Sequence, residues 1–190
     1  MGFRRGRLSN IIKTHDRCSS MGPNILLTGW PGVGKTTILK RVLSLLKREA
    51  GGFYTEEIRT DHRRVGFKIV TLEGREGVLA HVDYESKWRV GRYGVDLGNL
   101  EEIAVPAILE GIEEELVIID EIGKMELFSS EFREAVIQAL DSPTPVLGAI
   151  MLKPHPFADG VKGRPDVQIF VVTRDNRDTL VDKLVDGVCR

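Results

Sequence analysis

Residues 29 to 36 read Gly29-Trp30-Pro31-Gly32-Val33-Gly34-Lys35-Thr36 and match the pattern G-x-x-x-x-G-K-[ST]. The residues before them, Ile25-Leu26-Leu27-Thr28, have the composition of a buried strand, and apolar residues recur with helical spacing from Ile38 to Leu46. A glycine-rich loop between a strand and a helix brings backbone N–H groups and the positive end of the helix dipole close to phosphate oxygens. The stretch therefore predicts a phosphate-binding loop in an α/β fold.

Roles within the loop follow from the chemistry of a bound nucleoside triphosphate. Lys35 is expected to neutralise the β- and γ-phosphates, and the Thr36 hydroxyl is expected to bind Mg²⁺. Thr37 either touches the α-phosphate or is an ordinary residue of the first helical turn. We assign residues 29–36 and Thr37 to nucleotide binding, and we make no separate prediction for Trp30.

From Asn24 onward, short β-type runs alternate with segments of helical periodicity, which is typical of a parallel sheet with crossover helices. We therefore predict a mostly parallel sheet with helices on both faces. A loop rich in Pro, Gly and Lys should precede the last strand. The strands of the parallel core are expected at residues 25–28, 116–119, 146–150 and 167–172.

The region after the first helix differs from this pattern. Residues 52–58 and 65–72 read as two strands joined by a polar turn, which predicts an antiparallel hairpin added to the parallel core. Short extended pieces around residues 78–80 and 92–95 should continue it. A helix is expected next, at 97–108, and Pro106 should kink or divide it. A later helix should be capped by Ser129 or Ser130.

Size and composition limit the classes of protein. The 190 residues suit one domain, which we place at 23–190, after an N-terminal extension, 1–22, expected to be disordered. The 27 basic and 28 acidic side chains nearly cancel, so no global field favours nucleic acid or a membrane surface. Two cysteines near opposite termini do not make a disulfide framework, and no apolar run could span a bilayer. We expect a cytoplasmic monomer.

Two adjacent acids end a second apolar run, Leu116-Val117-Ile118-Ile119-Asp120-Glu121-Ile122-Gly123. If this strand lies next to the first one, Asp120 can hold Mg²⁺ through water, and Glu121 is free to orient or deprotonate a water in line with the γ-phosphorus. A separate acid beside the metal aspartate favours a hydrolase over a kinase. The alternative is that Glu121 only caps the strand or pairs with a nearby cation. Glu126 is a weaker candidate, as easily a solvated loop acid.

Charge that develops on the γ-phosphoryl group requires a further cation beside Lys35. Arg164, just before the last expected strand, is the first candidate, and Arg177 is the second. Either could equally be an ordinary surface arginine. None of the four histidines has a second ligand at metal spacing, so we assign no metal site to the protein alone.

Several longer motifs resemble one known family. The stretches GWPGVGKTT, GFYTEEIR, RVGFKIVTL, VGRYGVDL, LVIIDEIGKMEL and VTRDNRDTL, in this order, resemble the THEP-type nucleoside-triphosphatases, whose animal member is called the cancer-related nucleoside-triphosphatase. The likeness extends from about Asn24 to the C-terminus. The resemblance implies a RecA-like P-loop domain that slowly hydrolyses ATP, GTP, CTP and UTP with Mg²⁺ and little base preference. It also implies that residues 29–36 and 116–123 form the nucleotide site.

Two other readings stay open at this point. A nucleoside or nucleotide kinase is one, because the segment Lys153 to Arg164 could close over the phosphates as a lid. A nucleotide-operated switch that binds RNA or a protein is the other. Stimulation of turnover by an added partner would distinguish the switch from a free hydrolase.

Overall fold

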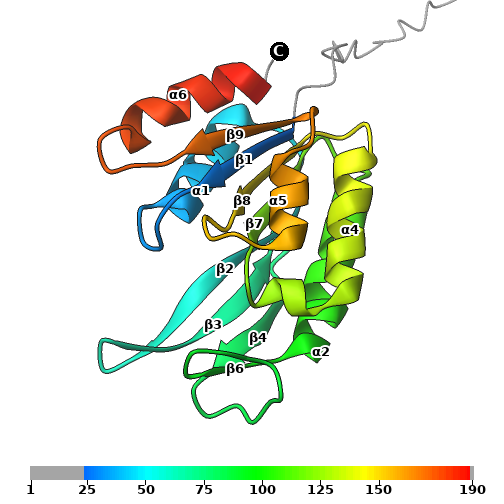
Figure 1. Ribbon diagram of the computed structural model, residues 1–190. Coiled ribbons are helices and arrows are strands. Elements are labelled where there is room, and N and C mark those ends of the chain that lie inside the picture. The colour runs from blue at the N-terminus through cyan, green and yellow to red at the C-terminus, as the bar shows by residue number, and fades with distance from the viewer. Residues whose placement is uncertain (1–23, 189–190) are drawn as a thin grey trace, which may run out of the picture.

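The computed structural model describes residues 24–188, so the predicted extension at residues 1–22 lies outside the described part of the chain. One mixed sheet passes through the whole of this part, with helices on both sides of it (Figure 1). No helix between residues 24 and 188 combines the length and the apolar character that a bilayer crossing requires.

The centre of the sheet holds five parallel strands, in the order β2 (Gly51–Thr60), β7 (Val117–Ile122), β8 (Val146–Ile150), β1 (Asn24–Thr28) and β9 (Val167–Val171). β1 and β8 are buried along their entire length, which explains why their sequences are continuous rather than alternating apolar runs. The predicted α/β fold with a parallel core is confirmed.

An antiparallel extension continues the sheet beyond β2, in the order β3 (Arg63–Thr71), β4 (Glu76–His81), β6 (Tyr93–Val95) and β5 (Arg89–Val90). The β2–β3 hairpin pairs Phe53 with Thr71 at its base and Thr60 with Arg63 at its tip. Its tip projects away from the parallel core (Figure 1). The predicted hairpin and its continuation by the pieces around residues 78–80 and 92–95 are confirmed.

The strand that carries the two acids is not the neighbour of β1. β8 lies between β7 and β1, and its residue Leu147 pairs with Ile118 on one side and with Ile25 on the other. The prediction of adjacent strands is therefore wrong. Strand order depends on where in the sheet each crossover connection places the next strand, and no local pattern in the sequence encodes that placement.

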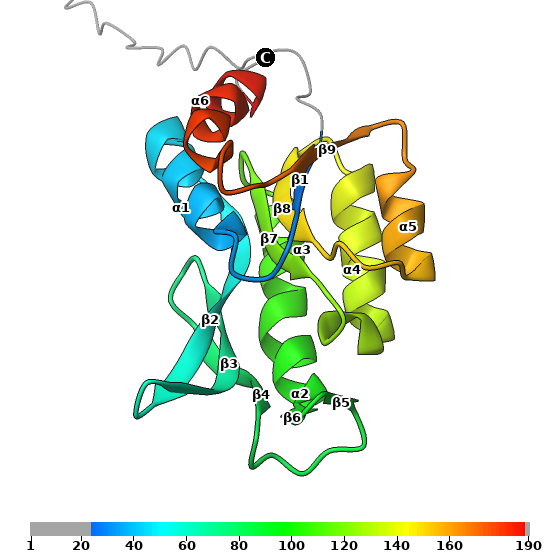
Figure 2. The same ribbon diagram turned by 60° about the vertical axis from the view of Figure 1, so that its left-hand side comes forward.

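Two groups of helices cover opposite faces of the sheet (Figure 2). The first group, α1 (Lys35–Leu46) and α6 (Arg177–Val188), shares a core with Ile25, Leu27 and Leu147. The second group packs on the other face, against Leu26, Phe53 and Ile119. Its members are α2 (Leu97–Asn99), the π-helical η1 (Leu100–Ala104), α3 (Val105–Gly111), the 3-10 turn η2 (Glu126–Phe128), α4 (Ser130–Asp141) and α5 (Pro156–Lys162).

The helix signals in the sequence are confirmed in two places. Pro106 lies in the first turn of α3, and the segment before it is π-helical, because proline has no N–H to continue the regular α-helical ladder. Ser129 caps α4, since its Oγ accepts a hydrogen bond of 3.1 Å from the backbone N–H of Phe132.

The segment before β9 is a helix rather than the predicted loop or lid. α5 buries Ala158 and Val161 in the same core as α4, so it packs against the sheet instead of covering the phosphate loop. Gly160 and Gly163 weaken the local helical signal, and tertiary burial of the two apolar residues overrides it.

The core beneath α4 depends on an aromatic pair that joins it to the hairpin strand. Phe53 and Phe132 are both fully buried, and their rings meet edge to face at 6.0 Å. We expect Phe53→Ala to lower the free energy of unfolding by about 3–5 kcal/mol, because it leaves a cavity at this junction. Urea unfolding measures the loss. Leu45→Ala is the control: Leu45 is 55 % exposed, and the change should alter stability by less than about 1 kcal/mol. Equal losses would contradict this packing.

Candidate nucleotide-binding site

The loop between β1 and α1 is shaped by glycines at its two ends. Gly29 lies against the backbone directly after β9, where an added Cβ would come within 2.7 Å of the Val172 carbonyl oxygen. Gly34 precedes α1 with φ of 106°, a conformation that other residues rarely adopt. The first turn of α1 therefore opens directly onto the loop, and its free N–H groups can face an anion there.

Lys35 is buried, and its ammonium group has two partners. Nζ lies 3.4 Å from the carbonyl oxygen of Gly29 and 3.1 Å from Oε2 of Glu121. The lysine that should neutralise the phosphates is thus held by the second of the two acids. The alternative role for Glu121, pairing with a nearby cation, is present in this structure, and the cation belongs to the phosphate loop itself.

Asp120 is 2 % exposed, and its Oδ2 has no hydrogen-bond partner among the described residues. Burial raises the pKa of Asp120 to about 6, a hydrogen bond from Thr36 lowers it, and the charge of Glu121 raises it. A buried carboxylate oxygen without a partner, beside a threonine hydroxyl, suits a hard cation that takes oxygen ligands. Thr36 and Asp120 therefore fit Mg²⁺ chemically. The part of the chain that the structure describes has no cluster of three or more His, Cys, Asp or Glu for a metal.

The other residues of the predicted site have different surroundings. Trp30 is 70 % exposed, Pro31, Gly32 and Thr37 are exposed, and Val33 is half-buried. The apolar part of the second stretch fills the core. Its two acids interact with the loop: Glu121 contacts Lys35, and Asp120 interacts with Thr36 and with the charge of Lys35. The structure thus places the side chains of five residues predicted to bind nucleotide in the core: Leu116, Val117, Ile118, Ile119 and Ile122.

Glu126 is not a solvated loop acid. It is 4 % exposed, and burial together with the nearby charge of Glu121 raises its pKa to about 8. Sequence reasoning underestimated this residue. The available signal was its position within an otherwise apolar segment, between Met125 and Leu127, which the 3-10 turn η2 folds into the core.

Arg164 does not reach the loop. It precedes β9 and forms ion pairs of 2.6 Å with Asp141 and 2.7 Å with Asp166. It also lines a hollow of about 690 Å³ together with Asn24, the first residue of β1, at the end of that strand opposite the loop. The structure thus does not bring Arg164, the first candidate for the further cation, to the loop. The second candidate, Arg177, begins α6 on the loop side of the sheet.

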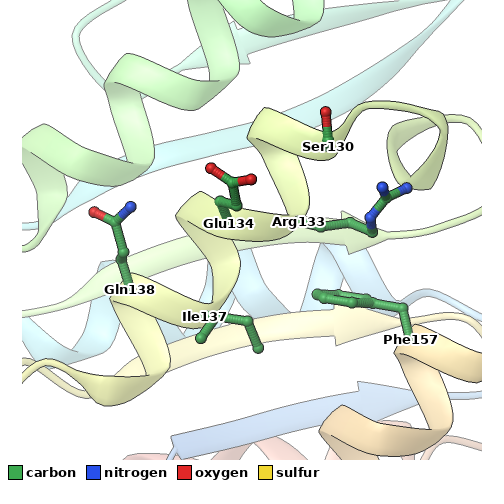
Figure 3. A pocket seen from close by; sticks show the side chains of 6 residues that line it. All are labelled: Ser130, Arg133, Glu134, Ile137, Gln138 and Phe157. Carbon is green, nitrogen blue, oxygen red and sulfur yellow. The ribbon is translucent and has the colours of Figure 1, made fainter.

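A second hollow lies on the face of the sheet that α4 and α5 cover. It measures about 360 Å³ and lies between α4 and α5, where Arg133 and Phe157 approach from the two helices (Figure 3). None of its lining residues belongs to the loop or to β7. The residues predicted to bind nucleotide thus lie at the strand–helix junction between β1 and α1 and at the end of β7, and neither hollow includes them.

Comparison with known proteins agrees with this geometry. A family model described as NTPase matches residues 24–185. The chain belongs to this NTPase family. The nucleoside-triphosphatase THEP1 of Thermotoga maritima is 49 % identical, over 85 % of this chain and 92 % of that protein. The human cancer-related nucleoside-triphosphatase is 42 % identical, over 88 % of this chain and 97 % of that protein.

Solved structures of this NTPase family have the same fold. The crystal structure of THEP1 from Aquifex aeolicus superposes with a TM-score of 0.81 at 37 % identity, covering 88 % of this chain and 99 % of that one. The solution structure of the human cancer-related nucleoside triphosphatase gives a TM-score of 0.76 at 41 % identity, covering 87 % and 97 %. The resemblance inferred from the sequence motifs is confirmed.

The burial of Glu126 predicts that the stability of the folded state changes with pH. Its pKa is raised from 4.5 to about 8 on folding, so the unfolded chain loses this proton first and the folded state becomes less stable as pH rises from about 4.5 to 8. Glu126→Gln removes this loss. We expect the Tm of the variant to exceed that of the wild type by a margin that grows from pH 5 to pH 8, measured by thermal unfolding. Glu131→Gln, at an exposed acid of α4, is the control. A margin independent of pH would contradict the burial.

Proposed function

We propose that this chain hydrolyses nucleoside 5′-triphosphates to diphosphate and phosphate, with Mg²⁺ and with little selectivity for the base. The observation that carries the proposal is the 3.1 Å contact between Glu121 and Lys35. It places Glu121, which is not one of the two residues assigned to Mg²⁺, beside Lys35, the lysine expected to bind the reacting phosphates. The names of the relatives, nucleoside-triphosphatases, support the same reaction.

Binding of a triphosphate begins with an exchange of partners at Lys35. The β- and γ-phosphates offer the ammonium group more negative charge than the single carboxylate of Glu121, so Lys35 turns to the phosphates and releases Glu121. The N–H groups at the start of α1 bind the remaining phosphate oxygens. Thr36 and Asp120 would hold Mg²⁺, which offsets the charge of the β- and γ-phosphate oxygens when it is bound.

The released Glu121 then acts on water. Its carboxylate accepts a hydrogen bond from a water placed in line with the γ-phosphorus. The water oxygen bonds to phosphorus while the bond from phosphorus to the bridging oxygen breaks, and the water proton passes to Glu121. The products are a nucleoside diphosphate and phosphate, and Lys35 balances the charge on the oxygens that leave.

Low base selectivity follows from what the site residues contact. Lys35, Thr36, Asp120 and Glu121 all act on the phosphates, the metal or the attacking water. A triphosphate of any base presents the same groups to them, so we expect ATP, GTP, CTP and UTP to be hydrolysed. A kinase is less favoured, because α5 is packed against the sheet and does not serve as a lid over the acceptor. The cytoplasmic location and the monomeric state stay predictions from composition.

The hydrolase proposal is tested by Glu121→Gln. Phosphate release from each of the four triphosphates is measured with Mg²⁺ and without an added acceptor. We expect the wild type to turn over all four, and the variant to lose turnover by about 10²-fold or more, as is usual when a general base is removed. Nucleotide binding should not weaken, because Lys35 no longer pairs with a carboxylate.

Binding is followed separately by tryptophan fluorescence, since Trp30 is exposed within the loop, and by calorimetry. A variant that binds nucleotide but does not hydrolyse it supports the role of Glu121. Equal phosphate release by both proteins would contradict that role. A wild type that releases no phosphate from any triphosphate would overturn the proposed function, and transfer to an added acceptor or activation by a partner would then identify a kinase or a switch.

The position of Arg164 makes a separate prediction. Arg164→Ala removes ion pairs to Asp141 and Asp166 at the end of the sheet away from the loop. We expect the free energy of unfolding to fall by about 1 kcal/mol, because the pairs are partly exposed, with kcat and KM unchanged. Steady-state kinetics and urea unfolding measure both. A large loss of kcat without a loss of stability would restore Arg164 to the site.

A further inference from the structure

Glu126 is a buried acid without a cation. Among residues 24–188, no Lys, Arg or His forms an ion pair with it. The acids that do form ion pairs lie mostly on the surface. Its charged neighbours are the two acids of β7, Glu121 and Asp120, and both oppose ionisation of its side chain. Backbone hydrogen bonds at Glu126 and Gly123 lower its pKa, but burial outweighs them, so the ionised form of this carboxyl group is costly.

The carboxyl groups of Glu126 and Glu121 both lie close to Gly123. A Cβ added to Gly123 would be 2.9 Å from Oε2 of Glu126 and 3.0 Å from Oε1 of Glu121. Both oxygens therefore lie near the position that a Cβ of residue 123 would occupy. Glycine has only a hydrogen atom there, so its side chain does not crowd the two carboxyl groups. Oε1 is the oxygen of Glu121 that Lys35 does not bind, because Lys35 contacts Oε2.

The backbone around Glu126 is held by several bonds. The N–H of Leu127 donates to the Gly123 carbonyl at 3.0 Å, and Arg133 donates to the Leu127 carbonyl at 2.6 Å. Ser129, which caps α4, donates to Glu101 of η1 at 2.6 Å. The turn is thus fixed to both α4 and η1, and Glu126 has a defined position relative to β7.

The environment of Glu126 favours the neutral form of its side chain. Burial, followed by the charge of Glu121, raises its pKa to about 8. A neutral carboxyl group has an O–H that can donate a hydrogen bond, and an ionised carboxylate is the strongest acceptor near it. Pairs of acids in which one is kept neutral and the other is ionised recur where proteins divide acid and base roles.

Glu121 needs a second partner during the reaction. In this structure its resolved partner is Lys35, which must turn to the phosphates when a triphosphate binds. A carboxylate that is to align a water with the γ-phosphorus has to keep one orientation after that exchange. Glu126 is the group next to its free oxygen, across Gly123.

We propose that Glu126 is a positioning residue for hydrolysis: its carboxyl group donates a hydrogen bond to Glu121 and holds that carboxylate toward the attacking water after Lys35 has turned to the phosphates. This inference rests on the proposed function, because it acts through Glu121. Glu126 touches neither the nucleotide nor the metal. Its removal should therefore lower kcat and leave nucleotide binding unchanged.

The experiment compares two replacements that differ in the ability to donate. Glu126→Gln keeps a side chain of the same size with an N–H donor, and Glu126→Leu fills the space without one. Steady-state kinetics with ATP and Mg²⁺ give kcat and KM, calorimetry gives nucleotide affinity, and thermal unfolding shows that each variant is folded. Glu131→Gln and Glu131→Leu, at an exposed position of α4, are the matched controls.

We expect Glu126→Leu to lower kcat by about 10- to 100-fold with unchanged KM and affinity, the usual range for losing a group that orients a reacting one. Glu126→Gln should stay within about 3-fold of the wild type, because the donor remains. Full kcat in Glu126→Leu, or equal losses in both variants, would overturn the inference. So would a weaker affinity that accounts for the whole loss.

Gly123→Ala provides a second variant that leaves both acids in place. Its Cβ would lie 2.9 Å from Oε2 of Glu126 and 3.0 Å from Oε1 of Glu121, so it should displace the two carboxyl groups and lower kcat in the way that Glu126→Leu does. Failure of the inference differs from failure of the proposed function. If Glu121→Gln is inactive while Glu126→Leu and Gly123→Ala retain full kcat, the hydrolase stands and the positioning role is lost. If the wild type releases no phosphate, both are lost.

Discussion

The parallel pairing of β7, β8, β1 and β9 determines where every charged group of the site can lie. Parallel strands deliver their carboxyl ends to one edge of the sheet, so the loop after β1 and the acids at the end of β7 meet there although β8 separates the two strands. The same pairing places the start of β9, with Arg164, at the other edge. The direction of the strands therefore determines which residues lie at the edge with the loop, called the reactive edge below, and which lie at the opposite edge with Arg164.

Charge at the reactive edge is not balanced in this structure. Glu121 pairs with Lys35, Asp120 and Glu126 interact with the charge of Glu121, and burial raises the pKa of both Asp120 and Glu126. Such an arrangement is unfavourable for stability, and it is suited to a ligand that brings a cation and takes the lysine away. A triphosphate with a bound Mg²⁺ has both properties. Under the proposed function, the contact between Lys35 and Glu121 would couple occupancy of the loop to release of the acid.

The face of the sheet that α4 and α5 cover positions residues instead of binding the phosphates. α4 and α5 bury Phe132, Ala158 and Val161 against the sheet and hold the turn that carries Glu126. The hydrogen bond from Ser129 to Glu101 joins this turn to the π-helical segment before α3. The helices on this face thereby fix the position of Glu126 near Glu121, so mutations in this layer are expected to reach the site through Glu126.

The sequence by itself determined the phosphate loop, the strand and helix on either side of it, the antiparallel hairpin, the division at Pro106 and the cap of α4. Each of these depends on residues within a few positions of one another, because hydrophobic period, glycine conformation and capping are local. It also indicated Asp120 and Glu121, which end an apolar run. The tertiary structure alone decided that β8 lies between β1 and β7, that α5 is a core helix, that Arg164 is remote and that Glu126 is buried beside Glu121. The first three features depend on strand order and on burial between segments distant in the chain, which no local pattern encodes. The position of Glu126 depends on how the turn η2 packs into the core.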